Sequence, residues 1–193
     1  MLESLCRGKL NKSFRNPTVR SVFVNMAHAL DFQFFKQPGG DIVVKELSII
    51  PIDNNIDPIV LLFKPPFPWR RLTDKYKNEN TWLKEKVHGL SWENGDLDYS
   101  QLGYMIRDSL KDAKEIYVIG SAKKKFLERF NFNVTDVIDL GYLQVDVTKV
   151  VHFCSNHDFE YKINCAAQNV KLIKKFLHAQ KEWEDTSMEW EYA

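Results

Sequence analysis

The sequence has no long apolar run and contains only three cysteines in 193 residues. A helix that spans a bilayer needs about 20 consecutive, predominantly apolar residues, so we expect no membrane-spanning segment. An odd cysteine count does not build a disulfide framework and favours a reducing, intracellular compartment. Residues 1–20 carry basic side chains without a continuous apolar core, which is not typical of a secretory signal.

An excess of charge of either sign is also absent. The 27 basic and 26 acidic residues leave a formal net charge of +1, so nucleic acid or membrane binding would have to come from local patches. The sequence also lacks a glycine-rich phosphate loop and a Gly-x-Ser-x-Gly nucleophile motif, which argues against a nucleotide-binding enzyme or a serine hydrolase.

The length fits one domain with its own hydrophobic core. We expect a flexible basic arm at residues 1–20, the domain at residues 21–181, and an acidic tail with two tryptophans at residues 182–193. Trp183 and Trp190 are candidate partner-binding residues because an aromatic side chain in an acidic peptide can enter an apolar groove on another protein. A frayed, disordered end is the alternative interpretation.

The hydrophobic pattern predicts an α/β fold. Three β-rich runs joined by short turns, at 21–35, 42–52 and 59–63, predict antiparallel strands. Helical and strand patterns then alternate, with helices at 69–86, 99–110, 122–130 and 164–180 and strands at 115–119 and 134–140. This order is that of the RNase H-like fold of DEDD-type 3′–5′ exonucleases, which is a mixed sheet of about five strands flanked by helices.

The carboxylates of that nuclease chemistry are not where it needs them. Two-metal nucleases hold Mg²⁺ ions with several converging acids. If the run at 21–35 breaks near His28, its first strand ends at residues 25–27, which contain no acid, and Asp31 is predicted to be out of register. Residues 123–125 are lysines, and the last helix offers Cys165 and Asn169. We therefore expect a catalytically inactive domain, and a ribonuclease with a non-standard site remains an alternative.

A metal site is predicted in the last third of the chain. Cys154 and His157 form a Cys-x2-His pair, and Cys165 follows where the last helix should begin. Thiolate and imidazole ligands suit zinc, which prefers four such donors in tetrahedral geometry. Buried cysteines near a surface histidine, without metal, are the alternative.

The segment from Cys154 to Ala166, leading into the final helix, resembles the signature of the Maelstrom domain. That domain is similar to an exonuclease whose catalytic acids have been replaced by a Glu-Cys-His-Cys zinc set. Glu46 lies at the position of the family's glutamate, just before an apolar stretch. The resemblance thus implies zinc bound by Glu46, Cys154, His157 and Cys165. His152 is an extra candidate ligand that could replace Glu46.

The resemblance also implies single-stranded RNA binding and protein partners in piRNA-type silencing of transposons, in cytoplasmic perinuclear granules or the nucleus. The densest basic patches are predicted to contact RNA; they are formed by Lys123, Lys124, Lys125 and Arg129, and by Arg70 and Arg71. Solvated helix faces are the alternative for these patches. A protein–protein adaptor that does not bind nucleic acid is the alternative for the whole domain.

Overall fold

The computed structural model of the chain describes residues 26–137, 156–157 and 164–190. Its core is a five-stranded mixed sheet with the strand order β3-β2-β1-β4-β5. The strands are β1 (Ala27–Lys36), β2 (Ile42–Pro51), β3 (Ile59–Leu62), β4 (Glu115–Val118) and β5 (Val134–Asp136). The helices are α1 (Asp74–Leu83), α2 (Leu102–Ser109), α3 (Ser121–Glu128) and α4 (Ala166–Trp190). Short helical turns are η1 (Pro38–Gly40), η2 (Trp69–Arg71), η3 (Lys84–His88) and η4 (Tyr99–Gln101).

The strands pair as the sequence predicted, with the first three antiparallel. β1 pairs with β2, and β2 with β3, in antiparallel register, whereas β4 runs parallel to β1 and β5 runs parallel to β4. Ala29 pairs with Tyr117, so β4 ends level with Leu30, and Asp31 lies just beyond its carboxyl end. The predicted α/β class and the flanked mixed sheet are therefore confirmed.

Helices cover both faces of the sheet because successive residues of a strand point to opposite sides. One face buries Leu30 and Phe32 of β1 against Leu102 and Ile106 of α2 and Leu127 of α3. The other face packs Ala29 and Ile50 against Val170, Ile173 and Leu177 of α4. Each face thus has its own apolar core, and among the described residues α4 supplies the helix side of the second one.

A β-bulge interrupts the pairing of β1 with β2. Gln33 pairs with Glu46, but the next residue of β1, Phe34, pairs with Val44, so Lys45 is the extra residue. The Lys45 ammonium is buried and donates to the carbonyls of Phe63, at 2.5 Å, of Trp92, at 2.8 Å, and of Asn94. Burial lowers the pKa of Lys45 to about 8. The bulge thus fastens the loop after η3 to the sheet.

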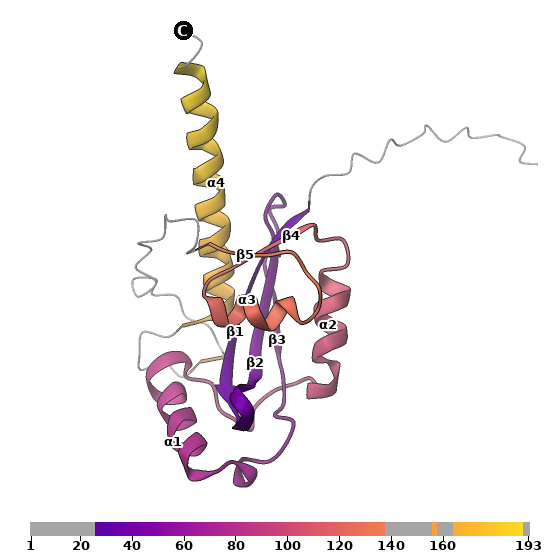
Figure 1. Ribbon diagram of the computed structural model, residues 1–193, viewed down its shortest axis with the longest axis vertical. Helices are drawn as coiled ribbons and strands as arrows, with labels where there is room; N and C mark the ends of the chain where they lie inside the picture. The colour runs from indigo at the N-terminus through magenta and orange to yellow at the C-terminus, as the bar shows by residue number, and fades with distance from the viewer. Residues whose placement is uncertain (1–25, 138–155, 158–163, 191–193) are drawn as a thin grey trace, which may run out of the picture.

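Three elements differ from the sequence prediction. β1 begins at Ala27, residues 21–25 of the predicted strand lie outside the described residues, and the helix expected at 69–86 is divided into η2, α1 and η3. Helix α4 includes residues 182–190, which were predicted to be a tail, because no glycine or proline follows Gly141 to end it. Its C-terminal half extends beyond the sheet (Figure 1). The predicted arm at 1–20 lies outside the described residues. No helix in the described ranges is long and apolar enough to cross a membrane.

Candidate metal centre

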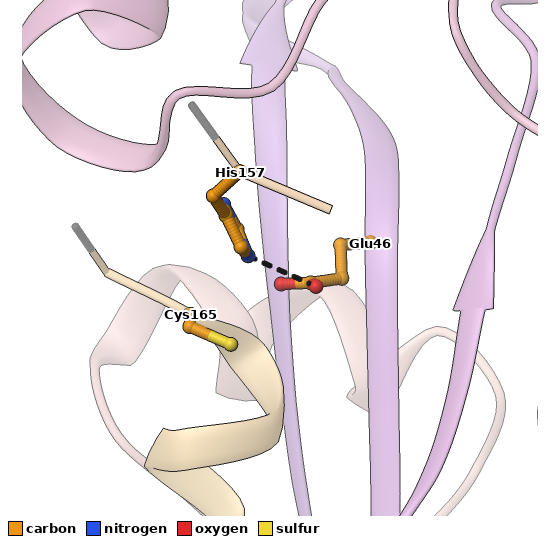
Figure 2. A group of neighbouring side chains, drawn as sticks. All are labelled: Glu46, His157 and Cys165. Atoms are coloured by element: carbon orange, nitrogen blue, oxygen red, sulfur yellow. Dashed lines mark hydrogen bonds and ion pairs between the residues drawn. The ribbon is translucent and has the colours of Figure 1, made fainter. Parts of the chain in front are cut away.

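Three predicted ligands from distant parts of the chain meet beside the sheet (Figure 2). Glu46 comes from β2, His157 from a turn, and Cys165 from the residue that precedes α4. One ligand atom of each lies within 4.8 Å of those of the other two. Their exposed fractions are 0%, 6% and 4%, so the cluster is closed to solvent in the part of the chain that the structure describes.

The Glu46 carboxylate joins the sheet to the last helix. The bulge turns this side chain toward α4, where its Oε2 accepts the backbone N–H of Ala166 at 2.8 Å. Ala166 is the first residue of α4, and the N-terminus of a helix offers unpaired N–H groups and a partial positive charge. The other carboxylate oxygen, Oε1, lies 3.1 Å from Nε2 of His157.

The hydrogen bond on the other ring nitrogen of His157 fixes its tautomer. Nδ1 lies against the carbonyl oxygen of His88, which can only accept, so Nδ1 must carry a proton. In a neutral ring Nε2 then has a lone pair that faces a carboxylate oxygen. Two acceptors at this distance repel each other unless a proton or a metal ion lies between them. The site therefore takes either an imidazolium–carboxylate pair or a bound cation.

Cys165 adds a sulfur donor at the same helix N-terminus. A cysteine binds metals as the thiolate. Cys165 also begins the helical hydrogen bonding, because its carbonyl accepts the N–H of Asn169 at 3.0 Å. The three described donors are thus one oxygen, one nitrogen and one sulfur. The predicted fourth ligand, Cys154, and the extra candidate His152, which could replace Glu46, lie outside the described residues.

The segment around His88 supports this centre, a role that the sequence analysis did not assign. His88 is buried, and the carbonyl of its neighbour Val87 accepts the N–H of Asn164 at 2.8 Å, just before Cys165. Burial, followed by the nearby charge of His157, lowers the pKa of His88 to about 4, so its ring stays neutral. Its Nδ1 accepts the N–H of Leu90 at 3.1 Å. A hydrogen-bonded carbonyl that orients a histidine is a common second layer of metal sites.

The predicted RNA-contacting residues have different environments. Lys123 pairs with Asp31 and its side chain is only 13% exposed, so little of it is accessible for an RNA contact. Arg129 is exposed and forms an ion pair with Asp41 at 3.0 Å. The others remain accessible: Lys124 is half-buried, and Lys125, Arg70 and Arg71 are exposed.

Asp31 was placed wrongly by the sequence analysis. It lies inside β1 with no exposed surface, because the strand begins at Ala27. Of the two predicted partner-binding tryptophans, Trp183 is 78% exposed on α4. Trp190 is the last residue of the same helix, and its side chain is not among those described.

Comparison of the chain with protein-family models, with curated proteins and with solved structures finds no match in any of the three.

Proposed function

We propose that this chain is a zinc-stabilised, RNase H-like domain without nuclease activity, which acts by binding RNA or protein. The observation that carries the proposal is the buried Glu46–His157–Cys165 cluster, whose three donors lie within 4.8 Å of one another. These side chains join β2 to the start of α4. A cation among them would tie the last helix to the sheet.

The donor types favour zinc over other common cations. Mg²⁺ and Ca²⁺ prefer oxygen ligands, whereas zinc takes imidazole nitrogen and thiolate sulfur with carboxylate oxygen. Structural zinc sites are closed and four-coordinate. Cys154 is the proposed fourth ligand, and His152 is the extra candidate that could replace Glu46. The exclusion of solvent from the three described donors supports a structural rather than a catalytic ion.

Strand order and local charge support the RNase H-like, non-catalytic part of the proposal. The order β3-β2-β1-β4-β5, with antiparallel β1–β3 and parallel β4 and β5, is the arrangement expected of that fold. The buried carboxylate at the centre of the sheet, Asp31, contacts Lys123, Asn169 and Gln33. An ammonium and two amides contact this acid, and the nearby Glu46 is turned to His157 and Ala166, whereas two-metal chemistry requires several converging acids.

The binding role rests on the resemblance to the Maelstrom domain and on exposed cations. The resemblance suggests single-stranded RNA as the ligand and piRNA-type transposon silencing as the setting. Arg70, Arg71 and Lys125 are exposed and, with the half-buried Lys124, are the candidates for phosphate contacts. Such contacts supply most of the affinity of non-specific binding and weaken with salt.

The protein adaptor is the second candidate, favoured by one feature of α4. This helix continues beyond the sheet (Figure 1) and presents Trp183 with 78% of its surface exposed. Exposed tryptophans are enriched among the residues that dominate the energy of protein interfaces. In this role the fold is a platform and the end of α4 makes the contact.

Two measurements test the proposal. Elemental analysis of protein purified without added metal should give about one zinc per chain, and the absence of zinc would refute the metal assignment. Electrophoretic mobility shift with labelled single-stranded RNA should show binding that decreases with salt. Arg70→Glu combined with Arg71→Glu should weaken it, whereas Lys111→Glu, an exposed control on another element, should not.

The same experiment separates the alternatives. A lack of any RNA shift, with a protein partner lost on Trp183→Ala, would favour the adaptor. Degradation of the oligonucleotide would show an active ribonuclease and contradict the interpretation of the central site as non-catalytic.

A further inference from the structure

A second buried polar cluster lies on the same face of the sheet, centred on Asp31. Its carboxylate accepts the side-chain amide of Asn169 at 2.8 Å and that of Gln33 at 3.2 Å, both at Oδ2. The other oxygen, Oδ1, is paired with the ammonium of Lys123. These groups come from β1, α3 and α4, so one carboxylate links three elements.

The location is one where α/β proteins commonly bind ligands. β1 has an antiparallel neighbour on one side and a parallel neighbour, β4, on the other. Asp31 lies just beyond the carboxyl end of β4, where the chain turns into α3. In open α/β sheets, ligand sites form outside the carboxyl ends of strands at such a reversal of direction. A buried acid at this position is therefore placed to hold a cation.

The position of Lys123 near the start of α3 does not by itself favour a positively charged side chain. Lys123 is the third residue of α3, where the helix macrodipole disfavours a positive side chain. Its side chain turns inward instead, with 13% exposure, and Nζ also lies 5.8 Å from the centre of the Phe32 ring. The opposing charge of Asp31 and the face of this ring are what stabilise the ammonium there.

The cluster is balanced by this single positive charge. Asp31 is fully buried, and burial raises its pKa while Lys123 and Asn169 oppose that rise. Leaving a buried carboxylate without its partner is strongly destabilising. A cation in contact with Asp31 thus stabilises the fold.

We propose that the ammonium of Lys123 is the built-in cation of this site, occupying the place of a divalent ion and closing the site to Mg²⁺ and Mn²⁺. The inference rests on the Asp31 cluster alone and does not depend on zinc at Glu46. It assigns a latent oxygen-donor site for divalent cations, in which Asp31 and the amide oxygens of Asn169 and Gln33 become ligands once the lysine is removed.

The test replaces Lys123 with an acid. Lys123→Glu places two carboxylates face to face, so the metal-free variant should melt below the wild type. Because two acids and two amide oxygens suit a hard cation, millimolar Mn²⁺ should raise its melting temperature by several degrees. Wild type and the Asp31→Asn/Lys123→Glu double variant should show no such rise. Lys125→Glu, at an exposed position of the same helix, is the matched control.

All samples are first loaded with zinc, so that Mn²⁺ is measured only at the second site. An Asp31-dependent Mn²⁺ response of the wild type would overturn the proposal, as would a folded Lys123→Glu variant that does not respond. If Lys123→Glu does not fold, Lys123→Ala serves instead, with bound Mn²⁺ followed by electron paramagnetic resonance. Binding to Lys123→Ala, but not to wild type or Asp31→Asn/Lys123→Ala, supports the built-in cation. Equal binding to all three refutes it.

Discussion

Replacing Glu46 with glutamine distinguishes a bound metal from a simple ion pair at the candidate centre. In the metal-free protein, the amide oxygen of the new side chain can accept the N–H of Ala166, and its NH₂ group can donate to Nε2 of His157. Every polar atom then keeps a partner. We expect the metal-free stability of Glu46→Gln to stay within about 1 kcal/mol of the wild type, the usual net value of one hydrogen bond.

With zinc present, the same substitution removes an anionic ligand and the expected difference is large. At free zinc ~1,000-fold above its dissociation constant, the wild type gains about 4 kcal/mol of unfolding free energy. For a chain of this size that corresponds to a rise of roughly 8–16 °C in melting temperature. If the substitution lowers the zinc affinity ~100-fold, the upper end for residues that only orient a ligand, zinc stabilises the variant by only about 1.4 kcal/mol. Its melting temperature then rises by only roughly 3–6 °C.

The assay is thermal unfolding followed by circular dichroism, in excess chelator and in zinc-buffered solution, with bound zinc counted in parallel. Glu128→Gln, which removes an exposed carboxylate of α3, is the control and should keep the full zinc-dependent rise. An equal rise for wild type and Glu46→Gln would show that the carboxylate is not a ligand. If zinc does not raise the melting temperature of the wild type, and Glu46→Gln is less stable than the wild type in chelator, the site holds an imidazolium–carboxylate pair.

Three further substitutions test the fold around the site. Ile173→Ala, in the fully buried contact of α4 with the sheet, should lower the unfolding free energy by about 2–5 kcal/mol in urea titrations, and an effect below ~1 kcal/mol would show that α4 is not packed as described. Gly95→Ala should lower the free energy of unfolding by more than the about 1–3 kcal/mol of a strained backbone, since φ of Gly95 is +146° and a Cβ would lie 2.3 Å from the carbonyl carbon of Phe63. An unchanged urea unfolding midpoint would contradict this loop geometry. Burial lowers the pKa of His28, so the unfolded chain binds more protons just below pH 6.5 and stability falls as the pH drops there. Between pH 7 and pH 5, the melting temperature of His28→Gln should therefore fall less than that of the wild type. Parallel plots of melting temperature against pH would show that His28 does not contribute.

The sequence predicted the order of strands and helices because alternating and helical spacing reflect which side of each element is buried. It could not give the phase of β1. Within the run predicted at 21–35, a break near His28 put the end of the first strand at 25–27 and Asp31 out of register, whereas β1 is continuous from Ala27 and encloses Asp31. Similarly, a run of three lysines looks uniform, and only the packing of α3 shows that Lys123 alone turns toward Asp31.

The candidate centre was accessible to sequence reasoning only in part. His157 and Cys165 are eight positions apart and hold donor types that suggest zinc, so their spacing carried the prediction. Glu46 is 111 residues before His157, and no local pattern relates the two. Its assignment came from the resemblance to a known domain. The carbonyl of His88, which sets the tautomer of His157, is a backbone group and leaves no sequence signal.

The extra residue in β2, Lys45, decides which helices the side chain of Glu46 faces. On the N-terminal side of Lys45, Val44 faces α2 and α3, and on its C-terminal side the alternation restarts so that Glu46 faces α4 and Leu47 faces α2 and α3. Regular pairing through Lys45, without the bulge, would send the Glu46 carboxylate into the apolar core and place Leu47 beside His157. The centre therefore depends on keeping Lys45 out of the alternation of β2, as well as on the ligands themselves.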